Sequence, residues 1–345
     1  MPLPARRPAR IDPRVAWFDD VWAVLSPMSG VTDRAFRDIC RDHGADLAFC
    51  EFTAAKGLTY DNPQTWRLID TEGEAGRVGV QIFGSDPAAM AEAARRMAGR
   101  RLDVLDINFG CPAKKVVRRN GGSALLADVP LLRRVAEAVV AASPVPVSAK
   151  IRTGWDARTV NYREVGLLLQ EAGCVWVTLH GRTRAQKFTG RADWDTIADL
   201  VETLDIPVIG NGDVTDADGW EAMIRQTGCH AVMIARGAIG NPWLFAAVAA
   251  RRAGRPFTPP TLAEILDVVE RHVRELARWR GERTGAHLVR KHVVRYLKGF
   301  PGAAALRRRL FAVADSGAML AELAAIRREA AGRASAETGE TRWAG

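Results

Sequence analysis

A loop cysteine is the residue whose type and surroundings most directly suggest chemistry. Cys111 lies in the segment INFGCPAKKVVRRNGG, and four basic residues follow it: Lys114, Lys115, Arg118 and Arg119. Nearby cations lower the pKa of a thiol and help it to exchange a proton. Such a thiol can act as a nucleophile, a redox group or a general acid. The segment contains no second cysteine that could resolve a disulfide.

Polar residues also end several apolar runs of the chain. Lys150 and His180 each end such a run, and Gln81 lies near the end of another. A lysine at this kind of position can form a Schiff base, act as an acid or base, or stabilise an anionic cofactor such as a reduced flavin. We favour the flavin, with Cys111 as the proton donor. His180 is either a site residue or a satisfied polar residue at a strand end.

Two glycine-containing segments predict a phosphate-bearing ligand. They read GNGDV (210–214) and ARGAIGNPW (235–243), and each follows an apolar run. Glycine lets backbone N–H groups approach an anion closely, and Arg236 adds positive charge. The alternative is that these glycines only form tight turns, but two such segments in succession favour a phosphate site.

The elements that would position these residues alternate between strands and helices. The apolar runs predict eight buried parallel strands, at 21–28, 46–51, 77–83, 103–108, 146–151, 175–180, 206–212 and 231–236. Helical periodicity occurs between them, at 33–43, 86–98, 130–142, 162–172, 194–204 and 216–227. We expect N-caps at Thr32, Ser85 and Thr215, and helix stops at Gly44, Gly173 and Gly228.

Eight strand–helix units predict an α/β fold of the TIM (β/α)8 barrel type, in which active sites lie at the C-terminal ends of the strands. We expect four regions: a disordered basic arm (1–20), the barrel (21–254), an all-helical domain (255–332) and a flexible tail (333–345). The Pro-rich stretch RPFTPPT marks the boundary between the barrel and the helical domain.

Positive charge is concentrated in one segment. The chain has 345 residues and a net charge of +9, and residues 251–310 contain 15 Lys and Arg against 5 Asp and Glu, a net charge of +10. This is either a face that binds a polyanion or an ordinary solvated helical surface.

Composition excludes several classes of protein. No apolar run reaches the ~18 residues that span a bilayer, and the Arg- and Pro-rich N-terminus does not read as a secretory signal. The five cysteines are widely spaced with no CxxC pair, which argues against a disulfide framework or a metal site. We expect a cytoplasmic protein without membrane contact.

The combined motifs resemble bacterial tRNA-dihydrouridine synthases, most closely the B type. The resemblance rests on SPMSGVTDRAFR, GVQIFGSDP, DINFGCPAKK, KIRTGW, TLHGRTRAQKFTG, GNGDV and ARGAIGNPWLF. It runs from about residue 25 to 245 and resumes at RKHVVRYLKGFPGAAALR (290–307).

The resemblance implies a tightly bound FMN and NADPH (or NADH) as reductant. The implied FMN contacts are Pro27, Met28, Ser29, Gln81, Lys150, His180, Asn211, Gly212, Asp213, Ala235 and Arg236. Two segments depart from the family pattern: Ala235 stands where glycine is usual, and AFCEFTAAKGL (48–58) replaces a different sequence after the second strand.

The resemblance also implies the reaction and its partner. Specific uridines of tRNA would become 5,6-dihydrouridine, with hydride from reduced FMN to C6 and a proton from Cys111 to C5. The base would leave the RNA stack to reach the flavin. The expected RNA contacts are Asn108, Lys114, Lys115, Arg152, Arg182, Arg184, Lys291 and Arg295. We expect a monomer with no obligatory protein partner.

Three rival functions remain open at this point. The chain could reduce ribosomal RNA, reduce a small molecule with FMN, or bind RNA without catalysis. The basic helical segment argues against a small-molecule substrate, and Lys150, Gln81 and Cys111 argue against loss of the flavin. Neither the reduced position nor the choice between NADPH and NADH follows from the sequence.

Overall fold

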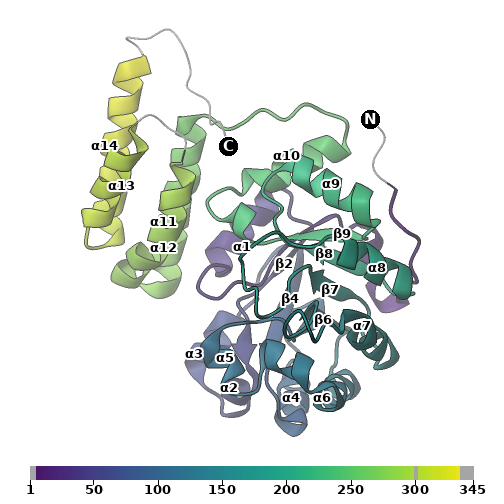
Figure 1. The fold of residues 1–345 in the computed structure, drawn as a ribbon. Coiled ribbons are helices and arrows are strands. Elements are labelled where there is room, and N and C mark those ends of the chain that lie inside the picture. Colours follow the sequence, from purple (N-terminus) through teal and green to yellow (C-terminus); the bar gives the residue numbers. More distant parts are fainter. Residues whose placement is uncertain (1–4, 299–301, 335–345) are drawn as a thin grey trace. The chain divides into compact units, whose positions relative to one another are not determined.

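The computed structural model describes residues 5–298 and 302–334, which form two compact units, Met1–Gly237 and Ala238–Gly345 (Figure 1). The expected boundary was at residues 254 and 255. It lies earlier because the segment after Gly237 packs on the helical unit: the Trp243 and Tyr296 rings are 6.0 Å apart, and a Cβ on Gly240 would lie 2.3 Å from that of Arg295.

The first unit contains a closed parallel barrel, which confirms the predicted fold class. Its eight strands each pair with the next, and β9 pairs with β1 to close the ring. They are β1 (Ala23–Leu25), β2 (Leu47–Phe49), β4 (Arg77–Phe83), β5 (Val104–Asn108), β6 (Val147–Arg152), β7 (Val177–His180), β8 (Val208–Asn211) and β9 (Ala231–Ile234). Seven of them lie within the predicted runs, and β6 extends one residue beyond its run, to Arg152. A short additional strand, β3 (Thr53–Ala54), pairs with the end of β4.

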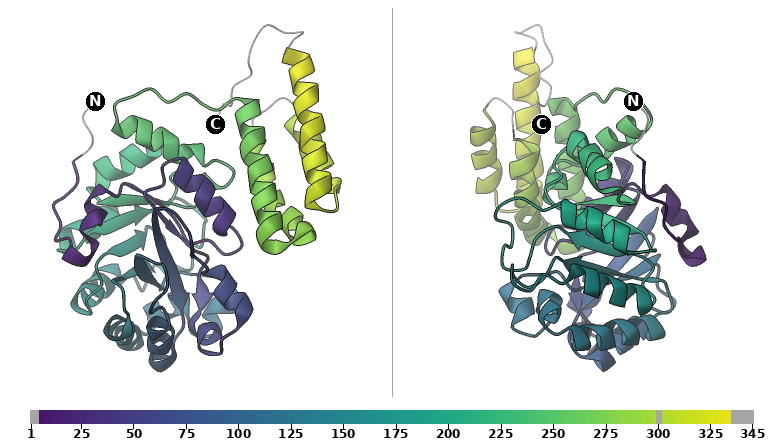
Figure 2. Two further views of the ribbon diagram at one scale, coloured as in Figure 1. Left: turned by 180° about the vertical axis from the view of Figure 1, so that it is seen from behind. Right: turned by 45° about the vertical axis from the view of Figure 1, so that its right-hand side comes forward.

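Helices follow one another around the outside of the barrel (Figures 1 and 2). The six predicted ones are α1 (Arg34–Asp42), α4 (Pro87–Arg95), α6 (Val129–Ala142), α7 (Tyr162–Glu171), α8 (Asp195–Thr203) and α9 (Ala217–Thr227). The shorter α2 (Ala55–Thr59), α3 (Pro63–Leu68), α5 (Lys114–Val117), η2 (Gly122–Ala127) and η3 (Arg236–Ala238) were not predicted.

Three helix caps lie one residue later than expected, at Asp33, Asp86 and Asp216. In each, the carboxylate accepts a backbone N–H of the first turn, as N-caps do. The Thr32 hydroxyl is engaged elsewhere, because it donates to the carbonyl of Met28 and accepts its N–H.

The N-terminal segment is ordered where disorder was expected. Residues Pro13–Asp20 form the 3-10 helix η1, and the buried Phe18 stacks on Trp176 with ring centroids 4.2 Å apart. The Arg6 guanidinium lies 3.2 Å from the Trp22 ring centroid and donates to the carbonyl of Val21. Trp22 and Trp176 precede β1 and β7, so this segment packs at the N-terminal end of the barrel. The expectation of a disordered arm therefore does not hold for residues 13–20.

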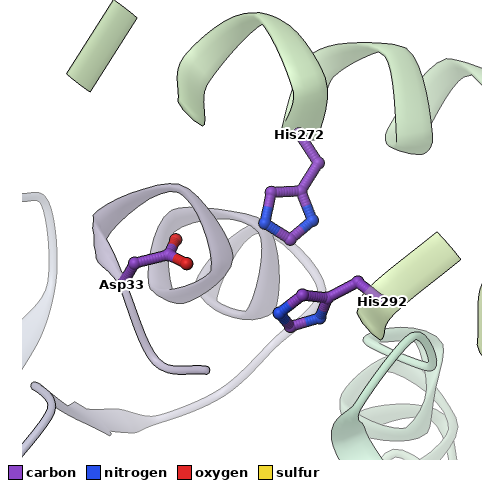
Figure 3. Close-up of side chains that lie close together, drawn as sticks. All are labelled: Asp33, His272 and His292. Carbon is purple, nitrogen blue, oxygen red and sulfur yellow. The ribbon is translucent and has the colours of Figure 1, made fainter. Parts of the chain in front are cut away.

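The second unit is helical, as predicted. It contains α10 (Trp243–Arg252), α11 (Leu262–Arg280), α12 (Glu282–Tyr296), α13 (Ala303–Ala312) and α14 (Ser316–Ala334). A capping box between Thr261 and Glu264 begins α11. The buried rings of His272 in α11 and His292 in α12 have centroids 4.6 Å apart (Figure 3).

Two further expectations from the sequence concern a flexible C-terminal tail and the absence of membrane contact. Residues 335–345 of the expected flexible tail lie outside the described residues. Among the described helices, none combines the length and the apolar character that crossing a bilayer requires.

We predict that Phe18→Ala destabilises the barrel by about 3–5 kcal/mol, because it removes a buried aromatic ring and leaves a cavity against Trp176. Urea denaturation of purified protein measures this loss. The matched control is Ala16→Ser at an exposed position of the same helix, which should change the free energy of unfolding by less than about 0.5 kcal/mol. Equal stability of the two variants would show that η1 contributes little to the barrel.

Candidate active site

The strand register brings polar side chains of four neighbouring strands to the same end of the barrel. Asn108 lies opposite Lys150 across β5 and β6, and His180 lies opposite Asn211 across β7 and β8. The Nζ of Lys150 donates to Oδ1 of Asn211 at 2.7 Å, and Nδ2 of Asn211 donates to the carbonyl of Met233 at 2.8 Å. These bonds hold the Asn211 amide in one orientation. The structure thus groups four of the predicted site residues.

Burial and neighbouring cations lower the pKa of both Lys150 and His180. Burial, then the nearby Arg152 charge, lowers the pKa of Lys150 to about 7. Burial, followed by the charges of Lys150, Arg152, Arg182 and Arg236, lowers the pKa of His180 well below its usual range. His180 is therefore a neutral imidazole at neutral pH.

The cluster carries positive charge that the described residues only partly neutralise. Asp213 pairs with Arg182 at 2.6 Å and with Arg236 at 3.3 Å. Within the described part of the chain, by contrast, Lys150 bonds to a neutral amide and Arg152 to backbone carbonyls. A buried cation without a carboxylate partner favours an anionic ligand. The donor set therefore fits an anionic, phosphate-bearing cofactor such as the expected FMN.

The two predicted phosphate segments follow β8 and β9. Gly212 has a φ of 127°, and a Cβ there would lie 2.6 Å from the Cβ of Ala192, so this position requires glycine. The carboxylate of Asp213 is occupied by Arg182, Arg236 and the backbone N–H of Ala192. Arg236 is 51% exposed and begins η3 directly after Ala235.

Hydrogen bonds from three elements fix the Cys111 loop. Oδ1 of Asn108 accepts the N–H groups of Gly110 at 3.1 Å and Cys111 at 2.8 Å. The Ser123 hydroxyl donates to the carbonyl of Cys111 at 2.8 Å, and Nε of Arg152 donates to that of Gly110 at 2.9 Å. The loop is thus fixed from β5, β6 and η2.

Cys111 differs from the other cysteines in its exposure. All five cysteines are free, and the other four are buried as predicted. We expected cations to lower the pKa of the Cys111 thiol, but burial raises it. The hydrogen bond from the backbone N–H of Ala113 and the charges of Arg152 and Lys150 oppose this rise only in part. The thiol is therefore protonated at neutral pH, the form that a general acid requires.

The expected cofactor residue Gln81 lies inside the barrel with both ends of its amide bonded. Its Nε2 donates to Oδ2 of Asp106 at 2.6 Å, and its Oε1 accepts from Nδ2 of Asn108 at 2.7 Å. Asp106 also accepts the Ser148 hydroxyl at 2.6 Å. The sequence analysis missed Asp106 and Ser148, although each lies two residues before a predicted site residue and so faces the same side of its strand.

The loop after β1 contains the other expected cofactor contacts. Pro27 is buried, Met28 partly buried and Ser29 exposed. The N–H of Met28 donates to the Thr32 hydroxyl at 3.0 Å, and the N–H of Gly30 donates to the carboxylate of Glu51. These contacts order the backbone at the C-terminal end of β1, next to β9.

The basic residues expected to bind RNA divide into two groups. Lys114 and Lys115 are exposed in α5, and Arg184 lies half-buried with its guanidinium 4.0 Å from the Trp155 ring centroid. Arg152 and Arg182 are each only 2% exposed. Their guanidinium groups hold loop carbonyls and, for Arg182, the Asp213 carboxylate, so the structure does not place these two among the exposed cations.

The remaining expected RNA contacts lie in the helical unit. Lys291 is partly buried and Arg295 exposed, one turn apart in α12. Tyr296 and Leu297 are buried, as predicted for residues off this row.

Comparison with known families and proteins agrees with this geometry. The sequence model described as "Dihydrouridine synthase (Dus)" matches residues 24–331. The chain is 39% identical over 301 residues to tRNA-dihydrouridine synthase B of Pseudomonas aeruginosa, covering 87% of this chain and 91% of the relative. It is 41% identical over 285 residues to tRNA-dihydrouridine synthase B of Xanthomonas axonopodis pv. citri, covering 82% and 86%.

Solved structures share the fold at low sequence identity. Histamine dehydrogenase from Rhizobium sp. 4-9 superimposes with a TM-score of 0.51 at 15% identity, over 72% of this chain and 48% of that structure. The 6-hydroxypseudooxynicotine amine oxidase from Pseudomonas geniculata gives 0.52 at 16% identity, over 71% and 51%. This chain spans about half the length of each, and the likeness shows the fold alone.

We predict that Lys150→Met changes how stability depends on pH in the ligand-free protein. Below pH 7 the ammonium is charged in both states, so its burial cost is fully present. Between about pH 7 and 10.5 the folded protein releases this proton while the unfolded chain retains it. The free energy of unfolding of the wild type, minus that of the variant, should then rise by about 1.4 kcal/mol per pH unit.

Urea denaturation of both proteins at several pH values from 6 to 10 measures this difference, and titrating groups far from Lys150 cancel. A difference that stays constant over this range would show that Lys150 is not buried as an amine.

Proposed function

Since the chain belongs to the dihydrouridine synthase family, we propose that it reduces specific uridines of tRNA to 5,6-dihydrouridine, with tightly bound FMN and with NADPH as the source of electrons. Relatives at about 40% identity are named for this action on tRNA. The observation that carries the proposal for this chain is the Cys111 thiol on a hydrogen-bonded loop at the C-terminal end of the barrel, where the charges of Arg152 and Lys150 act on it.

Four side chains would hold the polar and anionic parts of the cofactor: Lys150, His180, Asn211 and Arg236. Lys150 offers a buried ammonium that donates one of its three protons to Asn211. The neutral imidazole of His180 can donate or accept, and Arg236 adds charge next to the backbone of Gly212. When bound, reduced FMN would supply the hydride that adds to C6 of the uracil.

Cys111 would complete the reaction by giving its proton to C5. Burial keeps the thiol protonated until negative charge develops on the base. The thiolate that remains would be stabilised by Arg152 and Lys150, whose charges already act on this sulfur. Asn108 would contact the uracil through the second proton of its Nδ2, since the first is donated to Gln81.

Exposed cations would hold the RNA. Lys114 and Lys115 come three and four residues after Cys111 and would carry charge near the reacting base. In the helical unit, Lys291 and Arg295 lie one turn apart on α12, which suits contacts to successive phosphates. Arg152 and Arg182 would act differently, by keeping the loops around the base in place.

We predict that Cys111→Ala retains FMN and its reduction by NADPH but loses about 10²–10⁴-fold in the rate of uridine reduction, because the proton for C5 has no donor. Flavin absorbance follows binding and reduction, and mass spectrometry of the tRNA measures dihydrouridine. The matched control is Cys229→Ala, a buried cysteine at the other end of the barrel, before β9, which should keep the wild-type rate. Wild-type turnover by Cys111→Ala would rule out the thiol as the acid.

We also predict that Lys291→Ala and Arg295→Ala weaken tRNA binding, and that each lowers the slope of log K against log salt by about 1. Filter binding at 50–200 mM salt measures both quantities. Arg328→Ala, at an exposed position of α14, is the control and should leave the slope unchanged. An unaltered slope in the two α12 variants would place the RNA elsewhere.

A further inference from the structure

A chain of hydrogen bonds runs inside the barrel from Ser148 to the Cys111 loop. The Ser148 hydroxyl donates to Asp106 at 2.6 Å, and the Gln81 amide donates to the same carboxylate at 2.6 Å. Asn108 donates to Gln81 at 2.7 Å and accepts the N–H groups of the Cys111 loop. The strand register explains the first links, because Gln81, Asp106 and Ser148 are direct neighbours across β4, β5 and β6.

The Asp106 carboxylate decides which group donates and which accepts in this series of hydrogen bonds. An ionised carboxylate only accepts hydrogen bonds, so Gln81 must turn its NH2 group toward Asp106 and its oxygen toward Asn108. Asn108 must then donate to Gln81, which leaves its own oxygen for the N–H groups of Gly110 and Cys111. A neutral amide in place of Asp106 would accept either orientation of Gln81.

Asp106 remains an acceptor at neutral pH although it is buried. Burial raises its pKa to about 6, and the bonds from Ser148 and Gln81 and the charge of Lys150 oppose the rise. A buried carboxylate is costly compared with an apolar or amide side chain of similar size. Its two oxygens are nevertheless fully engaged, one with Ser148 and one with Gln81.

We propose that Asp106 is a positioning residue, whose charge sets the orientation of the Gln81 and Asn108 amides and thereby holds the Cys111 loop in the arrangement that presents the thiol. The importance of that loop rests on the proposed role of Cys111 as the acid. The orientation of these amides is a property of the folded protein and can be tested without measuring turnover.

The test reverses the direction of the two hydrogen bonds that Gln81 makes. In Asn108→Asp, two carboxylates face the ends of one Gln81 amide, so one of them meets its oxygen. In the double variant with Asp106→Asn, Asn at 106 can donate to the Gln81 oxygen while Gln81 donates to Asp at 108. That carboxylate can also accept the two loop N–H groups, so every bond is restored, and the two bonds of Gln81 run in the opposite direction.

The readout is alkylation of Cys111 by iodoacetamide in the folded protein, followed by mass spectrometry. The other four cysteines are buried, so Cys111 reacts first. Rates are measured from pH 6 to 10 and fitted, so that the limiting rate constant of the thiolate is separated from its pKa. This separation matters because Asp at 108 changes the local charge.

We expect Asn108→Asp to raise the limiting rate constant about tenfold, because repulsion between the Gln81 oxygen and the carboxylate at 108 shifts that carboxylate away from the loop N–H groups. We expect the double variant to return within about threefold of wild type. Asp106→Asn alone should raise the rate constant about fivefold, roughly half of the effect of Asn108→Asp, because without the charge Gln81 can take either orientation. The thermal unfolding temperature should fall in Asn108→Asp and recover in the double variant. A double variant that recovers neither quantity, or an Asn108→Asp protein that matches wild type, overturns the proposal.

Gln81→Met separates this mechanism from simple repulsion between two carboxylates. It removes the link and leaves the charges at 106 and 108 unchanged, so we expect about tenfold faster alkylation. Wild-type reactivity of Cys111 in Gln81→Met would overturn the proposal even if the double variant recovers. These outcomes do not depend on uridine reduction, so failure of the catalytic role of Cys111 would be recognised separately by its alanine variant.

Discussion

Burial of ionisable groups at the C-terminal end of the barrel strands is the constraint on which the site depends. Loss of water raises the pKa of the Cys111 thiol and lowers the pKa of Lys150 and His180. Each group is thereby shifted toward its neutral form, while Arg152 and Arg182 keep the site positive. An anionic ligand relieves that charge, and a protonated thiol can then give its proton when negative charge develops nearby.

Much of the fold could be predicted because parallel barrel strands are buried on both faces and appear as continuous apolar runs. Helix caps were displaced by one residue because a Thr or Ser and the Asp that follows it can both serve as the N-cap. The order of η1 could not be predicted locally. Its Phe18 is buried by Trp176, more than 150 residues away in sequence, and the Pro- and Arg-rich composition around it resembles a disordered arm.

The candidate site was predictable where a residue type follows from its place at a strand end, as for Lys150, His180 and Asn211. The burial of a side chain was not predictable from the sequence, and so Arg152 could not be distinguished from an exposed cation such as Lys114. Asp106 could have been predicted as a site residue, since it lies two residues before Asn108 in a strand and therefore faces the same side. The opposite sign of the Cys111 pKa shift has the same origin, because desolvation depends on the folded surroundings and not on nearby sequence.

The account therefore depends on a Cys111 thiol that remains protonated at the pH where the enzyme works. Its titration can be measured directly as the difference in thiolate ultraviolet absorbance between the wild type and Cys111→Ser, in which the four buried cysteines cancel. We expect an apparent pKa above the ordinary value of 9.0, because burial outweighs the nearby cations. A pKa below 7 would mean that the sulfur is a thiolate in the resting protein, and the role of Cys111 as the acid would be contradicted.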